Sequence, residues 1–181
     1  MSETTFNFAE VQSSKEVKPV IRPGVNENIT VGLLTEDLTP NGKKVIRVPF
    51  TSADGAELVI DMSMEGGAPQ YTMRKIKHLM TKVADEDTVN AASNLDAVNK
   101  ILRGKTLRMK FTGEEYVSQK DGKVYVKTVL GLPNFAEPMT TSKEMSALVY
   151  DTNNQYDLKR VNQATVEGNA PLKPVSDDLP F

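Results

Sequence analysis

The sequence of 181 residues has no cysteine, no tryptophan and a single histidine, His78. The absence of cysteine excludes disulfides, a cysteine nucleophile and thiolate metal ligands. One histidine cannot form a multi-histidine metal site, and its basic neighbours Arg74, Lys75 and Lys77 predict an exposed structural residue on a helix. Any chemistry would rest on carboxylates, hydroxyls and lysines, which favours a binding protein over an enzyme.

Long apolar runs are also absent. No stretch approaches the roughly 20 apolar residues of a membrane span, and Met1–Phe6 lacks the basic start and apolar run of a secretory signal. Hydrophobic residues make up 39% and charged residues 25% of the chain, which is typical of an ordinary folded protein. We therefore expect a cytoplasmic protein without membrane contact, with one domain and an appendage.

Three enzyme motifs are missing: the GxxxxGK[ST] phosphate loop, the GxSxG elbow and the HExxH zinc motif. Glu57, Asp61 and Glu65 have the spacing of ordinary strand side chains rather than that of a metal-dependent nuclease. Gly66-Gly67 precedes an expected helix, but no Lys-Ser/Thr follows to complete a phosphate site. The sequence predicts no catalytic residue, no metal and no cofactor, and a nuclease is the least favoured alternative.

The net charge of −2 is distributed unevenly along the chain. Residues 70–130 carry 12 basic and 7 acidic side chains, a net charge of +5. Residues 1–69 and 131–181 are acidic, with net charges of −4 and −3. Such a division is expected when a phosphate-binding surface coexists with an acidic tail that docks elsewhere.

Hydrophobic periodicity predicts a mainly β protein with a helical insert. Apolar residues alternate with polar ones in five predicted strands, at about 28–36, 44–50, 57–64, 105–117 and 123–130. Asn41-Gly42 marks a hairpin turn, and Gly32 within the first strand predicts a bulge or sharp bend.

Between the third and fourth strands the period changes to that of a helix. An amphipathic helix is predicted over 70–84, a break at Asp85–Asp87, and a shorter helix over 94–103 that ends before Gly104. The predicted apolar stripe of the longer helix is Met73, Ile76, Met80 and Val83. Residues 142–150 and 156–161 fit either a short helix or an added strand.

Three strands, a helical insert and a two-stranded hairpin form the element order of the oligonucleotide/oligosaccharide-binding fold, the OB-fold, although another small barrel would also fit. The predicted fold class is a five-stranded OB-fold-like barrel with helices between the third and fourth strands and a disordered C-terminal tail. Phe50 and Phe111 are expected in its core, whereas Phe135 fits either core or surface.

Binding a single strand without sequence preference needs a basic groove and flat side chains on which bases stack. The outward positions of the last hairpin offer both, and the second strand would extend the surface. The candidates are Lys43, Lys44, Arg47, Arg108, Lys110, Tyr116, Lys123, Tyr125 and Lys127. A solvated sheet face would also carry such residues, but their gathering on one face favours nucleic-acid binding.

The chain ends on Asp177, Asp178, Leu179, Pro180 and Phe181. Proline restricts the backbone, phenylalanine is an apolar anchor, and the carboxylates suit a basic rim on a partner. This ending resembles the acidic tip of bacterial and phage single-stranded DNA-binding proteins. The likeness covers these five residues, and it is only topological over about residues 25–135.

That resemblance implies a protein that coats single-stranded DNA in replication, recombination or repair and recruits partner enzymes through the tip, in a bacterium or a phage-infected cell. The predicted organisation is a flexible arm (1–22), an OB-fold domain that binds single strands (23–164), and a flexible linker with the docking tip (165–181). Many bacterial members stack bases on tryptophan, which this chain lacks. The alternative is a phage accessory protein with an OB-like barrel that binds another protein and no nucleic acid.

Overall fold

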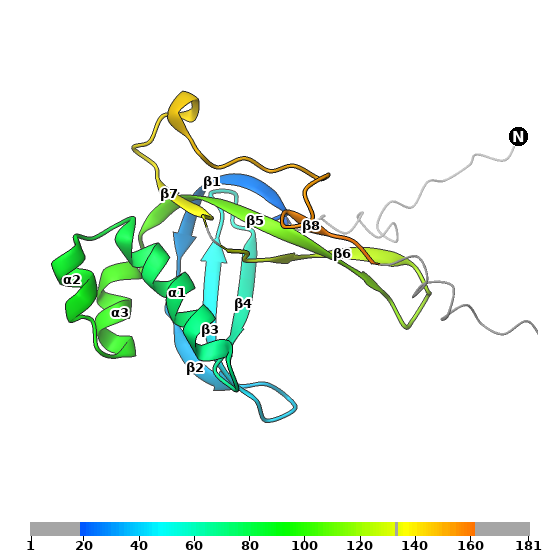
Figure 1. Ribbon diagram of the computed structural model, residues 1–181, viewed down its shortest axis with the longest axis horizontal. Helices are drawn as coiled ribbons and strands as arrows, with labels where there is room; N and C mark the ends of the chain where they lie inside the picture. Colours follow the sequence, from blue (N-terminus) through cyan, green and yellow to red (C-terminus); the bar gives the residue numbers. More distant parts are fainter. Residues whose placement is uncertain (1–18, 133, 162–181) are drawn as a thin grey trace, which may run out of the picture.

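The computed structural model describes residues 19–132 and 134–161. In this range the protein is mainly β, with three helices inserted between the fourth and fifth strands (Figure 1). The strands are β1 (Gly24–Val31), β2 (Thr35–Leu38), β3 (Lys44–Thr51), β4 (Glu57–Ser63), β5 (Thr106–Val117), β6 (Val124–Val129), β7 (Ala136–Pro138) and β8 (Leu158–Lys159). The helices are α1 (Ala68–Thr81), α2 (Glu86–Ala91) and α3 (Leu95–Leu102), and a 3-10 turn covers Lys143–Met145.

One eight-stranded sheet joins all the strands in the order β2-β3-β1-β5-β6. β4 pairs with β3, while β7 and β8 pair with β5, and every pairing except β5 with β8 is antiparallel. The mainly β class and the position of the helical insert are therefore confirmed. Within the described residues no pairing joins β4 to β6, so the sheet is open and closure of the barrel stays a prediction.

The first predicted strand is two strands, because the chain bends at Gly32. The Gly32 amide donates to the Pro49 carbonyl at 2.8 Å, and a Cβ at Gly32 would lie 2.7 Å from Pro49 Cγ. Only glycine allows so close an approach of two backbones. The bend predicted at this residue is therefore confirmed, and it lets β1 and β2 both pair with β3.

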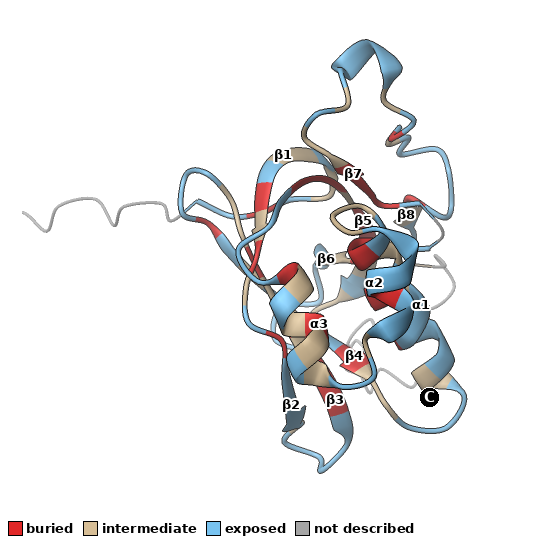
Figure 2. Cartoon of the chain, turned by 90° about the vertical axis from the view of Figure 1, so that its left-hand side faces the viewer, coloured by how far each residue is buried: buried red, intermediate tan, exposed pale blue. Residues whose placement is uncertain are grey.

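The core lies between the sheet and the helices. Phe50 on β3 and Phe111 on β5 meet edge to face, with ring centroids 5.4 Å apart, and both are fully buried, as predicted. Phe135 is buried as well. In Figure 2 the buried segments, in red, run through the strands and mark one side of α1 and α3. Ile21 also belongs to this core, so the ordered domain begins before residue 23.

Helix α1 buries two residues of the predicted stripe, Ile76 and Met80, but not Met73. Its buried residues are Thr72, Ile76, Leu79 and Met80, whereas Met73 is 53% exposed. The buried face includes Thr72, which a prediction based on apolar residues alone leaves out. Thr72 satisfies its hydroxyl by donating to the Ser63 carbonyl at 2.7 Å, which removes the cost of burying it.

Asp85 begins a helix rather than ending the helical region. Its carboxylate accepts a hydrogen bond from the Thr88 amide at 2.8 Å and caps α2. The sequence did not predict this helix. Asn94 caps α3 in the same way through the Ala97 amide. Asn99 of α3 then exchanges two hydrogen bonds with the Leu34 backbone, which ties the insert to the bend between β1 and β2.

The predicted linker and tip, residues 165–181, lie outside the described residues, as does most of the predicted arm. None of the helices in the described ranges has the length and apolar composition that crossing a membrane requires.

His78 is half-buried rather than exposed, and it joins α1 to the start of β7. Its Nε2 accepts hydrogen bonds from the amides of Phe135 and Ala136 at 3.4 and 3.3 Å, and the imidazole packs on the Phe135 ring at 4.5 Å. Burial, and secondarily the nearby Lys82 ammonium, lower the pKa of His78 below its usual value. The neutral imidazole is thus the form that fits the fold.

We predict that the free energy of unfolding falls as the pH drops below about 6.5, the ordinary pKa of histidine. The folded state then binds fewer protons than the unfolded state, so protonation favours unfolding. Denaturant titrations between pH 7 and 5 should show a steeper loss for the wild type than for His78→Gln, which cannot titrate. Parallel curves for the two proteins would contradict this role for His78.

Candidate nucleic-acid interface

β5 carries three residues of the predicted interface, Arg108, Lys110 and Tyr116. Leu107, Met109 and Phe111 point into the core, so the alternate positions point to the outer face of the strand. Along that outer face lie Arg108, Lys110, Thr112, Glu114 and Tyr116. Of these five residues, Arg108 and Thr112 are buried, Lys110 and Glu114 are partly buried, and Tyr116 is exposed.

Arg108 is buried, and the prediction of an exposed position is wrong. The residue is 4% exposed. Its guanidinium forms ion pairs with Glu27 at 3.1 Å and Glu137 at 3.5 Å, and it donates to the Thr141 carbonyl at 2.8 Å. Glu27 lies on β1 and Glu137 on β7, the two strands that pair with β5 here, and their carboxylates already occupy the guanidinium, so it is not free to bind a phosphate.

Glu137 completes this buried cluster. Burial opposes its ionisation, but hydrogen bonds from Ser146 and the Ala147 amide, together with Arg108, hold the pKa of Glu137 below its usual value. The carboxylate accepts from Ser146 Oγ and from the Ala147 amide, each at 2.7 Å. These bonds fix residues 139–161, here called the covering segment, onto the sheet.

Lys110 is also held in an ion pair. Its ammonium lies 2.8 Å from the carboxylate of Asp157, which is almost fully buried. Burial opposes ionisation of Asp157, but Lys110 and the Asp151 amide lower its pKa. The Asp157 carbonyl also accepts from the Gly113 amide at 2.8 Å. Lys110 therefore holds the covering segment rather than presenting a free charge.

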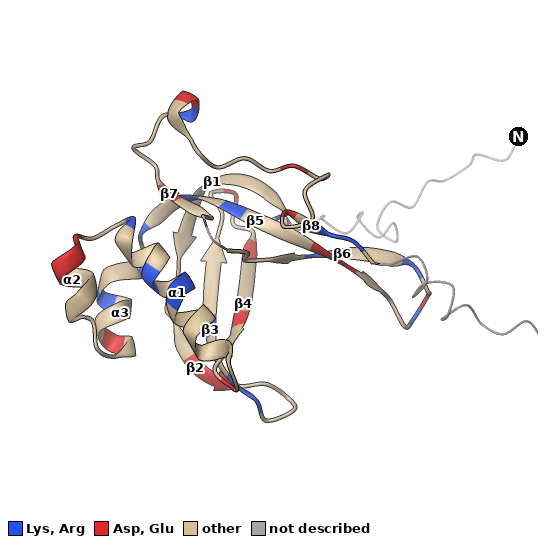
Figure 3. Cartoon of the chain, in the orientation of Figure 1, with Lys and Arg blue, Asp and Glu red and all other residues tan. Residues whose placement is uncertain are grey.

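Lys43, Lys44 and Arg47 are not brought together with the β5–β6 hairpin. They lie on β3 and the turn before it, and β1 and β5 separate β3 from β6 in the sheet. The Arg47 guanidinium contacts Asp37 and Asp61, the latter at 2.9 Å. Figure 3 shows acidic positions on β2 and β4 beside them. This face offers exposed charge of both signs rather than a basic groove.

The β5–β6 hairpin presents the aromatic residues that the sequence predicted. Figure 1 shows it extending away from the helices, past the rest of the sheet. Tyr116 and Tyr125 are direct cross-strand partners, with ring centroids 6.0 Å apart and planes at 31°. They are 46% and 44% exposed. Tyr125 donates its hydroxyl to Asp121 at 2.6 Å, which fixes the ring on the outer face.

Basic residues flank the tyrosine pair on the same face. Lys127, the cross-strand partner of Glu114, lies 2.8 Å from its carboxylate. Lys159 of β8 reaches the same carboxylate at 3.1 Å. Lys127 first, then Lys159, lower the pKa of Glu114, so one negative charge sits between two positive ones. At the turn, Lys123 is exposed, and within the described ranges it forms no ion pair.

The covering segment also contributes residues that the sequence did not predict. Its end brings Tyr156, Lys159 and Arg160 beside β5, and Arg160 reaches Glu115 at 3.5 Å. In the sequence, the only sign of this contribution is a tyrosine, Tyr156, three residues before the pair Lys159-Arg160. Residues 134–161 contain almost no regular structure, so no strand or helix pattern predicts where these side chains lie.

No protein-family model matches this chain, and no curated protein matches it at a significant level. Within the described part of the chain, no group of three or more histidine, aspartate or glutamate side chains could hold a metal ion. The predicted docking tip, Asp177–Phe181, lies outside the described residues. The described part of the candidate interface therefore consists of the hairpin and the covering segment.

We predict that Arg108→Ala lowers the free energy of unfolding by about 3 kcal/mol, because it leaves two carboxylates without their buried cation. Arg103→Ala is the matched control, since Arg103 is an exposed arginine at the end of α3. Urea denaturation would measure both. An unchanged stability of Arg108→Ala would show that the guanidinium does not hold the covering segment.

Proposed function

We propose that the protein binds single-stranded DNA without strong sequence preference and is not an enzyme. The observation that carries this proposal is the exposed Tyr116–Tyr125 pair on the extended β5–β6 hairpin, with Lys123, Lys127 and Lys159 around it. Tyrosine rings stack on any base, and lysines contact any phosphate, so the arrangement suits strands of any sequence. The described part of the chain offers no recognition helix for a duplex major groove.

The topology supports an OB-fold as the scaffold for this activity. The five long strands lie in the order β4-β3-β1-β5-β6 with the helices between β4 and β5. An OB-fold barrel, which is often partly open, would form if the two edge strands β4 and β6 met. The turn between β5 and β6 corresponds to a loop that OB-folds use to bind oligonucleotides.

The C-terminal tip supplies the second half of the proposal. Asp177–Phe181 would recruit enzymes of replication, recombination or repair, as in the single-stranded DNA-binding proteins that the sequence resembles. Docking on the rim of a partner's basic pocket would use the two aspartates and the terminal carboxylate, and the phenylalanine would fill the pocket. The setting would be the cytoplasm of a bacterium or of a phage-infected cell.

The opposite face of the hairpin favours a second candidate function. Val124 and Val126 are exposed there on the edge strand β6. Exposed apolar side chains on an unpaired strand edge are suited to contact with another protein. In this alternative the chain is a protein-interaction module with an OB-like barrel, and the lysines of the hairpin only keep the protein soluble.

We expect the full chain to bind oligothymidine more tightly than a duplex of the same length. Tyr125→Ala and Tyr116→Ala should each weaken binding by about 1–3 kcal/mol, the usual contribution of one stacked base. Tyr125→Phe should retain most of the affinity, because the ring remains when the hydrogen bond to Asp121 is lost. Fluorescence anisotropy with a labelled oligonucleotide measures each affinity.

The salt dependence of the same measurement tests the lysines. Lys127→Ala should reduce the slope of log affinity against log salt by about one unit, whereas Lys100→Ala on α3 should leave it unchanged. Glu114→Gln should strengthen binding, because it removes the carboxylate that competes with phosphates for Lys127 and Lys159. Equal affinity for the duplex, or no binding at any salt concentration, would favour the protein-interaction module.

Deletion of residues 177–181 should leave the affinity for oligothymidine unchanged or slightly higher, and should abolish partner recruitment. The acidic tip is tethered to the same chain, so it competes with phosphates at a high effective concentration. Phe181→Ala should lose the partners but keep the DNA affinity of the full chain, since the aspartates remain. Pull-downs from host lysate that recover the same replication or repair enzymes with and without the tip would contradict this role.

A further inference from the structure

Tyr156 is the most exposed tyrosine in the described part of the chain, at 75%. It lies between two depressions in the surface of about 530 and 450 Å³, within the size range of small-ligand sites. The first is formed by the covering segment alone, and the second also includes Arg74 of α1 and Leu132. An exposed ring between two hollows has both of its sides open to a flat ligand.

The backbone that carries this ring is held firmly. The Tyr156 amide donates to Asn154 Oδ1 at 3.0 Å. The next residue, Asp157, is 3% exposed and is bound by Lys110, by the Asp151 amide and by the Gly113 amide. The ring is thus presented on a fixed support, which reduces the entropy that a bound ligand would cost.

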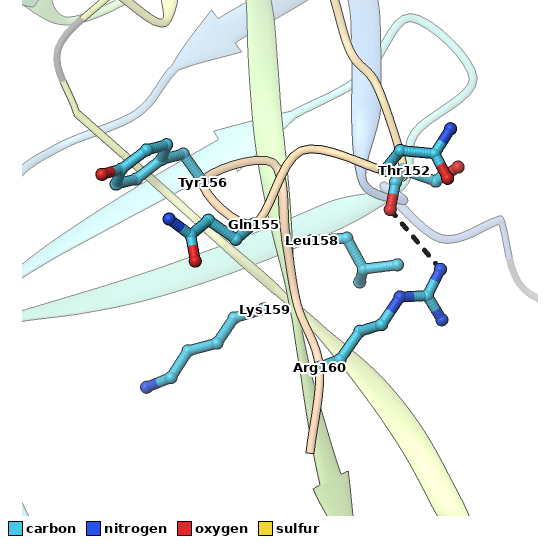
Figure 4. Close-up of a pocket in the computed structure, with 7 residues that line it drawn as sticks. Thr152, Gln155, Tyr156, Leu158, Lys159 and Arg160 are labelled. Atoms are coloured by element: carbon cyan, nitrogen blue, oxygen red, sulfur yellow. Dashed lines mark hydrogen bonds between the residues drawn. The ribbon is translucent and has the colours of Figure 1, made fainter. Parts of the chain in front are cut away.

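Positive charge lies on both sides of the ring. Figure 4 shows Tyr156, Gln155 and Lys159 pointing to the same side of the segment, while Arg160 turns toward the Thr152 carbonyl. On the side of α1, the Arg74 guanidinium borders the second depression and lies 5.8 Å from the centroid of the exposed Tyr71 ring. A base on Tyr156 would have a cation near each neighbouring phosphate.

Shared contacts link these residues to the hairpin. Lys159 shares the Glu114 carboxylate with Lys127, and Lys127 lies on the same face as the tyrosine pair. Lys159 and Tyr156 border one depression, and Tyr156 and Arg74 border the next. An aromatic and basic path therefore runs from the hairpin over the covering segment to α1.

We propose that Tyr156 is a second base-stacking position, and that a single strand bound at the hairpin continues over the covering segment to Arg74 on α1. This inference rests on the proposed binding of single-stranded DNA and adds the direction in which the strand runs. A short oligonucleotide needs the hairpin alone. A longer one reaches Tyr156, with phosphates beside Lys159 and Arg74.

The test compares full-length Tyr156→Ala, Tyr156→Phe and wild type by anisotropy with oligothymidines of about 4 and about 16 nucleotides, the range of OB-fold site sizes. Tyr156→Ala should weaken binding of the longer strand by about 5-fold or more, and the shorter strand much less. Tyr156→Phe should bind both as the wild type does. Val149→Ala is the matched control, an exposed residue of the covering segment outside both depressions.

Photocross-linking of the wild type to an iodouracil-substituted strand gives an independent readout, with cross-links expected at Tyr156 as well as Tyr125. If Tyr125→Ala weakens binding but Tyr156→Ala does not, and no cross-link forms at Tyr156, the path is wrong and the proposed function stands. If the wild type binds neither oligonucleotide, both are overturned.

Discussion

The arrangement of the protein depends on two cations on the outer face of β5, of which Arg108 is buried and Lys110 is partly buried. Arg108 and Lys110 occupy successive outward positions, and each would be costly to bury without a carboxylate partner. Glu27, Glu137 and Asp157 supply those partners. Because Glu137 precedes the covering segment and Asp157 lies near its end, pairing these charges ties both ends of the segment to β5. The carboxylates stay ionised despite their burial, as the lowered pKa values of Glu137 and Asp157 indicate.

This pairing divides the basic residues of β5 and β6 into two groups with different roles. Arg108 and Lys110 are paired with carboxylates and hold the covering segment to the sheet. Lys123 and Lys127 remain exposed beside the tyrosine pair, and Lys159 of β8 lies next to them. The covering segment thus blocks one part of the predicted interface and contributes residues to another part. Residues that are alike in sequence differ here in their partners: buried carboxylates hold Arg108 and Lys110, whereas Lys123, Lys127 and Lys159 are exposed.

Local pattern predicted much of the fold. Alternation gave β3, β4, β5 and β6 to within a few residues, and Gly32 marked a bend that a close backbone contact requires. The rest of the fold depends on contacts between residues far apart in the sequence, or on side chains that cap helices. Asp85 caps a helix, although three consecutive acids resemble a break. Alternation placed Arg108 correctly on the outer face of β5, but periodicity within one strand cannot show that residues 30 positions later will cover that face. For the same reason Tyr156 was missed.

We expect an anionic strand to bind over the hairpin and the covering segment, while Arg108 and Lys110 stay paired with carboxylates beneath it. Covalent labelling of lysines with an amine-reactive reagent, read by mass spectrometry with and without oligothymidine, tests this binding surface. Lys123, Lys127 and Lys159 should become protected on binding, Lys43 and Lys44 should stay reactive, and Lys110 should react slowly in both states. Protection of Lys43 and Lys44 with unchanged reactivity in the hairpin, or rapid labelling of Lys110 in the free protein, would contradict it.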